Sequence, residues 1–152
     1  MSVETAQTLA CSLICSRMDY CNAVSYDSHV TTLSKLQRVQ NNIARVIPFE
    51  FQGEHMHCHQ LHWLPVEQRI TYKLAVLTFR TRQQSSPKYL HELLVTRSCT
   101  RTLRSANRLL LEIPRTHTAF ASRSFRVAEP TIWDSLPTDV ITCSTVDTFK
   151  NT

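Results

Sequence analysis

The sequence contains a single glycine, Gly53, among its 152 residues. Sheet-rich folds use glycine at tight turns and bulges, because glycine adopts positive φ without a steric penalty. The scarcity of glycine therefore favours helices joined by short polar loops. It also excludes the phosphate-binding loops GxGxxG and GxxxxGK[ST], since each of them needs more than one glycine.

Targeting and membrane-spanning segments are also missing from the sequence. The first nine residues lack a basic start and carry polar side chains, unlike a signal peptide. No apolar run approaches the roughly 20 residues that span a bilayer. We therefore expect a soluble chain without a membrane partner, located inside the cell in the nucleus or cytoplasm. Its six cysteines form no CxxC pair and are expected to be reduced.

The sequence shows no arrangement of catalytic groups. No GxSxG elbow surrounds any serine. Two-metal phosphoryl transfer needs clustered carboxylates, whereas the aspartates at positions 19, 27, 134, 139 and 147 are scattered. We predict no catalytic residue, no cofactor and no small-molecule substrate.

Positive charge is concentrated in the middle of the chain. Residues 31–108 hold twelve Lys and Arg against four Glu, a net charge of +8 within a chain whose total is +5. An excess of this kind suits an anionic partner, with nucleic acid first and a membrane surface second. A basic but merely solvated surface is the alternative.

Helical spacing of apolar residues dominates the first two thirds of the chain. It predicts helices over 5–24, 31–47 and 66–83, and a short one from Pro87 through Leu94 or Val95. Thr31 or Thr32 can cap the second helix. The third helix is apolar on two sides, which indicates that it is sandwiched between neighbours.

The chain changes character after Thr96. Residues 97–108 are polar and basic and form either a linker or the arm of a short β-hairpin, with a short strand at 109–113. Residues 120–136 have loose helical spacing interrupted by Pro130, and Val146 and Phe149 begin a further helix. Trp63 and Trp133 each stand shortly before a proline, and we predict that both are core anchors rather than stacking platforms for bases.

The helix predicted over 31–47 has two distinct faces. Its apolar residues share one arc at 100° per residue: Leu33, Leu36, Val39, Ile43, Val46 and Ile47. The opposite side carries Lys35, Arg38, Asn42 and Arg45, and no acidic residue lies between Asp27 and Glu50. Spaced cations and an amide suit contact with a phosphate backbone.

A histidine-rich stretch over 55–62 is the main candidate for metal binding. On a helix, His55, Cys58, His59 and His62 would share a face. Four ligands would then span about 10 Å, too far for one tetrahedral ion. Further ligands would have to come from Cys99 or Cys143, so we assign no metal site and keep a metal-binding domain as an alternative.

Seven segments in register resemble motifs from the late part of LINE-type (non-LTR) retrotransposon reverse transcriptases. They are SRMDYCN at 16–22, LQRVQNNIAR at 36–45, LHWLPVEQRI at 61–70, PKYL at 87–90, RTLRS at 101–105, IWDSLP at 132–137 and TFK at 148–150. The order and approximate spacing of the motifs agree with the family over nearly the whole chain.

This resemblance implies a place after the polymerase palm, in the thumb and the segment beyond it. The palm's Y/F-A-D-D metal-binding motif does not occur here, so the resemblance implies a catalytically inactive fragment. We expect a mainly α fold: a small helical thumb-like bundle over 1–96, then a basic linker and a truncated, less regular region with C-terminal helices over 97–152.

The thumb of such an enzyme grips nucleic acid, so we expect backbone contacts to RNA or DNA. The resemblance selects Arg38, Asn41 and Arg45, and helix geometry adds Lys35 and Asn42. The basic segment adds Arg101 and Arg104. The alternative is a relic helical module without a nucleic-acid role, which at most binds a protein through exposed apolar surface.

Overall fold

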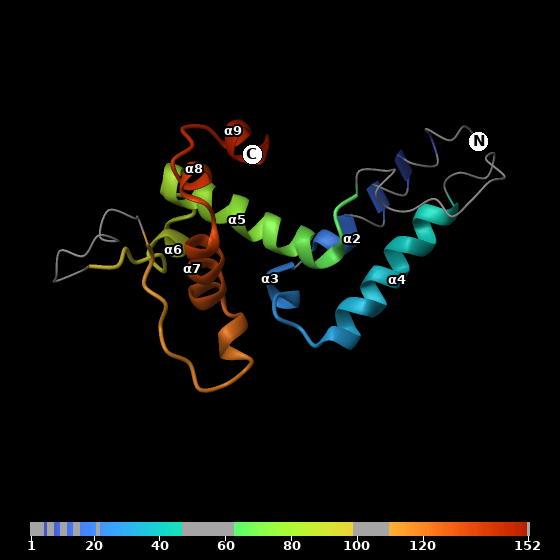
Figure 1. The fold of residues 1–152 in the computed structure, drawn as a ribbon, viewed down its shortest axis with the longest axis horizontal. Coiled ribbons are helices and arrows are strands. Elements are labelled where there is room, and N and C mark those ends of the chain that lie inside the picture. Colours follow the sequence, from blue (N-terminus) through green and yellow to red (C-terminus); the bar gives the residue numbers. More distant parts are fainter. Residues whose placement is uncertain are drawn as a thin grey trace. The chain divides into compact units, whose positions relative to one another are not determined.

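A computed structural model of the chain describes residues 5, 8–9, 12–13, 16–20, 22–46, 63–98 and 110–151. Most of these residues lie in helices, and none of the described residues belongs to a β-strand (Figure 1). The predicted mainly α fold class is therefore confirmed. No helix in this part of the chain is long and apolar enough to cross a membrane.

Among the described residues of the helix predicted over 5–24, the helix is interrupted at Tyr20. Helix α2 spans Ser16–Asp19 and α3 spans Asn22–Ser25. Between them, the Tyr20 N–H is shared between the carbonyls of Ser16 and Arg17, a pattern common where a helix ends. Apolar spacing continued across this break, so periodicity did not reveal it.

Helix α4 spans Val30–Val46, close to its predicted bounds. The residue before it, His29, accepts a hydrogen bond through Nδ1 from the Thr31 N–H at 3.3 Å. The cap predicted at Thr31 or Thr32 is therefore supplied at an earlier position, by a side chain that satisfies a free N–H of the first turn.

Helix α5 spans Val66–Gln84 and confirms the third predicted helix. Pro65 precedes it, and its carbonyl accepts from the Arg69 N–H at 2.8 Å. Residues on both predicted apolar sides are buried, among them Ile70, Leu74, Val76 and Phe79. After a break at Ser85, which has φ 52°, the short α6 spans Lys88–His91 and ends before the predicted end at Leu94 or Val95.

The chain divides into two compact units, residues 1–70 and 71–152, with the boundary between them inside α5. We call them the N-terminal unit and the C-terminal unit. The division predicted between residues 96 and 97 marks a change in sequence character, and it stays a prediction.

The C-terminal unit contains the 3-10 helix η3 (Ala121–Arg123) and three α-helices after it. These are α7 (Phe125–Ser135), α8 (Thr138–Ile141) and α9 (Val146–Asn151). The helix predicted from Val146 is confirmed. Helix α7 runs through Pro130, where an interruption was predicted. Burial of Val127, Ile132 and Trp133 around the proline offsets the lost backbone hydrogen bond.

The short strand predicted over 109–113 is reduced to an isolated antiparallel bridge between Thr96 and Leu111. Two backbone hydrogen bonds flank the bridge: Arg97 N–H to Leu110, and Glu112 N–H to Val95. The side chain of Asp134 accepts a hydrogen bond from the Leu111 N–H at 2.9 Å. A side-chain acceptor on α7 therefore satisfies the Leu111 N–H, which points away from the Thr96 segment.

Three aromatic rings form the centre of the C-terminal unit. Phe79 stacks on Phe149 with centroids 4.5 Å apart, and Trp133 lies 6.5 Å from Phe79 and 6.4 Å from Phe149. All three residues are at least 95% buried. The core role predicted for Trp133 is thus confirmed, and bases cannot stack on a ring that solvent does not reach. Trp63, for which the same role was predicted, is only half-buried.

Candidate functional site

The solvent-exposed face of α4 carries the strongest local group of binding residues. Lys35, Arg38 and Asn42 are all exposed, and Thr31 is exposed one turn before Lys35. These four positions lie within about 60° of one another around the helix axis, and Lys35 to Asn42 covers about 10 Å along it. The whole helix contains no acidic residue. The face thus presents two cations and polar donors without a competing carboxylate of its own.

The other predicted contact residues have different surroundings. Asn41 is half-buried, and its Oδ1 accepts a hydrogen bond from Gln37 Nε2 at 2.9 Å, so this side chain is partly engaged within α4. Arg45 belongs to α4, but its side chain lies outside the described part of the structure. Arg101 and Arg104 also lie outside the described residues.

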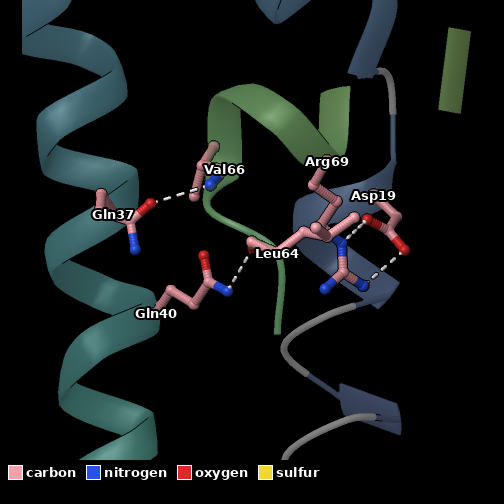
Figure 2. Close-up of polar contacts among 6 residues, drawn as sticks. All are labelled: Asp19, Gln37, Gln40, Leu64, Val66 and Arg69. Carbon is pink, nitrogen blue, oxygen red and sulfur yellow. Dashed lines mark hydrogen bonds and ion pairs between the residues drawn. The ribbon is translucent and has the colours of Figure 1, made fainter. Parts of the chain in front are cut away.

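Two glutamines on the inner side of α4 bind the residues that begin α5. The Val66 N–H donates to Gln37 Oε1 at 2.8 Å, and Gln40 Nε2 donates to the Leu64 carbonyl at 2.9 Å. Figure 2 shows both side chains pointing from α4 toward this segment. We call these two contacts the glutamine clamp.

The clamp fixes the orientation of each amide group. A backbone N–H can only donate and a carbonyl can only accept, so Gln37 presents its oxygen and Gln40 its nitrogen. Val66 is the first residue of α5, and its N–H has no acceptor within the helix. Gln37 therefore caps α5 from a position 29 residues earlier in the chain.

An ion pair ties α2 to the first turns of α5. Arg69 Nε and Nη2 donate to the two carboxylate oxygens of Asp19 at 2.5 and 2.9 Å (Figure 2). Both side chains are about one-fifth exposed. This two-point geometry fixes the planes of both groups as well as their separation.

The polar contacts join three of the segments that carried the family resemblance. Asp19 belongs to the segment at 16–22, both glutamines belong to 36–45, and Arg69 belongs to 61–70. Reasoning from the sequence singled out none of these four residues. Amides one turn apart on a helix are a signal that could have identified the clamp, but nothing local indicates their partners.

Burial of α4 departs from the predicted apolar arc. Its most buried described residues are Gln40 and Ala44, each 1% exposed, whereas Val39 is 47% exposed. The buried face is turned by about 60° toward the glutamines, because the clamp sets which side meets the start of α5. The prediction of a packing face centred on the apolar arc was wrong at Val39.

The C-terminal unit contains a buried carboxyl group, that of Glu129, and a half-buried guanidinium group, that of Arg82. Both carboxylate oxygens of Glu129 are buried without a hydrogen-bond partner, and burial raises the pKa of this carboxyl to about 9. The Arg82 guanidinium lies 4.7 Å from the centre of a Trp133 ring. Burial lowers the pKa of Arg82, and the nearby Asp134 charge opposes this shift.

Metal binding finds no support within the described part of the chain, where no three His, Cys, Asp or Glu residues gather into a site. The stretch 55–62 lies outside that part. No protein-family model, curated protein or solved structure is detectably similar to this chain. The resemblance to a reverse transcriptase therefore rests on the sequence motifs alone.

Proposed function

We propose that this chain is a catalytically inactive fragment, similar to the C-terminal part of a non-LTR retrotransposon reverse transcriptase, that binds nucleic acid without sequence specificity. The exposed, acid-free face of α4 with Lys35, Arg38 and Asn42 carries the proposal. Its side chains suit phosphate oxygens, and the face includes no aromatic residue that would stack on bases.

The proposed binding should depend strongly on salt concentration. Binding that rests on phosphate contacts releases counterions, so affinity falls steeply with salt. Dissociation constants for nonspecific binding typically lie at about 10⁻⁴ to 10⁻⁶ M at physiological salt. No polymerase activity is expected from the chain alone, because its sequence lacks the carboxylate motif that would hold the metal ions.

Fluorescence-anisotropy titration with a short RNA–DNA hybrid, at about 50 and about 200 mM salt, tests this proposal. The double variant Lys35→Ala/Arg38→Ala should bind more weakly and with a smaller salt dependence. Arg115→Ala/Arg126→Ala, which removes two exposed cations from the C-terminal unit, is the charge-matched control. Equal losses in both variants would show that only net charge matters and would reject α4 as the site.

A protein-binding module is the second candidate. Several large apolar residues of the N-terminal unit are more than 40% exposed: Leu9, Leu13, Tyr20, Val24, Val30, Val39 and Leu64. Where exposed apolar residues form a contiguous patch, that patch marks a surface that binds other proteins. A folded chain that binds a dye for apolar surfaces and fails to bind the hybrid would favour this function.

A further inference from the structure

The glutamine clamp lies on the same helix as the exposed cations, and Gln37 and Gln40 flank Arg38 in sequence. Gln40 is 1% exposed and Gln37 is half-buried, so neither glutamine is placed to contact a nucleic acid. Their amides instead contact the backbone of Leu64 and Val66. Any effect of these glutamines on binding must therefore pass through the position of α4.

Apolar packing of α4 is partial. Among its described apolar residues, Ala44 is buried, and Leu33, Leu36 and Ile43 are half-buried. Partial apolar packing is non-directional, so it does not by itself fix the rotation of the helix. Directional hydrogen bonds then decide how the helix is rotated and where along its axis it meets α5. A rotation or slide of α4 would move Lys35 and Arg38 together, because both belong to the same rigid helix.

We propose that Gln37 and Gln40 are positioning residues that hold the cationic face of α4 in its binding orientation. This inference rests on the proposed nucleic-acid binding by Lys35 and Arg38. It adds that the two glutamines act with opposite hydrogen-bonding polarity: Gln37 as an acceptor for Val66 and Gln40 as a donor to Leu64.

Because the two glutamines differ in hydrogen-bonding polarity, the same substitution, glutamine to glutamate, should affect them differently. In Gln37→Glu, a carboxylate still accepts the Val66 N–H, and a negative charge suits the N-terminus of α5. The Gln37 Nε2 donor to Asn41 is lost, but the Asn41 amide carries an NH2 group that can donate to the carboxylate after a turn of its side chain. In Gln40→Glu, an ionised carboxylate faces the Leu64 carbonyl and has no proton to donate. Both variants lower the net charge equally, as does the control Gln68→Glu at an exposed position of α5.

Acidification adds a readout that loss of packing would not produce. Once protonated, the carboxyl introduced by Gln40→Glu regains an O–H that can donate to the Leu64 carbonyl. Burial disfavours the charged form, so the pKa of this introduced carboxyl is expected to lie above the ordinary value for glutamate. Affinity of Gln40→Glu relative to Gln68→Glu should therefore recover toward about pH 5.

The experiment is anisotropy titration of the full-length chain and its variants with the RNA–DNA hybrid, at about pH 7.5 and about pH 5. At the higher pH, Gln37→Glu should match Gln68→Glu within about twofold, and Gln40→Glu should bind about tenfold more weakly. Gln40→Met, which also lacks the donor, should be weak at both pH values. Circular dichroism checks that the helix content of each variant is retained.

The outcomes distinguish failure of the positioning role of the glutamines from failure of the proposed nucleic-acid binding by α4. Equal affinities for Gln37→Glu and Gln40→Glu, or no recovery of Gln40→Glu in acid, would overturn the positioning role while leaving binding by α4 intact. Should Gln40→Glu fail to fold, retained affinity in Gln40→Met would overturn that role. If Lys35→Ala/Arg38→Ala binds like the wild-type chain, the proposed function itself is rejected, and the positioning role with it.

Discussion

Each of the two units of this chain is stabilised internally by a different kind of interaction. In the C-terminal unit, the described core is an aromatic cluster of Phe79, Trp133 and Phe149. In the N-terminal unit, the described residues that are both apolar and buried are Ala44, Val66 and Ile70, and side-chain polar contacts join its helices. Apolar burial is non-directional, whereas hydrogen bonds specify orientation. In the N-terminal unit, which contains the candidate binding face, individual hydrogen bonds thus determine how the helices are oriented.

Removing the largest ring of the aromatic cluster should have the largest effect on stability. Trp133→Ala leaves a cavity beside Phe79 and Phe149 and removes the ring that contacts Arg82. We expect a loss of about 3–5 kcal/mol in the free energy of unfolding, measured by urea denaturation. Phe120→Ala is the control, because Phe120 is 83% exposed and its loss should change stability by no more than about 0.5 kcal/mol. Similar losses from both variants would contradict an aromatic core.

The buried acid of the C-terminal unit should make stability depend on pH. The folded-state pKa of Glu129 is about 9 against an ordinary value of 4.5. Between these pH values the folded state holds a proton that the unfolded state has released, so stability falls as pH rises. Glu129→Gln should remove this dependence and stabilise the chain at neutral pH by about 1–3 kcal/mol.

Urea denaturation at about pH 5, 7 and 9 measures this effect. Glu112→Gln, at an exposed position, controls for the change in net charge. An identical pH profile for wild type and Glu129→Gln would mean that the Glu129 carboxyl is not buried as described.

Breaking the ion pair of the N-terminal unit should have a smaller effect. Arg69→Ala removes both hydrogen bonds to Asp19, and partial exposure of the pair limits the loss to about 1 kcal/mol. A double-mutant cycle with Asp19→Ala isolates the coupling between the two side chains. Strictly additive losses would show that the contact does not stabilise the unit.

The same contrast explains which parts of the fold could be predicted from the sequence. Helices α4 and α5 are long and strongly periodic, so their bounds followed closely from apolar spacing. Trp133 was correctly assigned to the core because a tryptophan shortly before a helix-starting proline, here Pro137, is usually an anchor for core packing. The break at Tyr20 was missed, since it interrupts the backbone without interrupting the apolar pattern.

The candidate site was predictable only in part. The exposed face with Lys35, Arg38 and Asn42 followed from helix geometry alone. The inner face did not, because its burial depends on where Gln37 and Gln40 find partners in a segment more than 20 residues away. A hydrophobic pattern predicts which residues are buried, but it does not predict which backbone group forms a hydrogen bond with a given side-chain amide.

Amide chemical-shift mapping by NMR tests the proposed binding face most directly. The ¹⁵N-labelled chain is titrated with the RNA–DNA hybrid, and the shift of each assigned amide is followed. We predict that the largest shifts occur at Thr31, Lys35, Arg38 and Asn42, on the exposed face of α4. Largest shifts in the C-terminal unit, around Arg115 or Arg126, would contradict binding by α4.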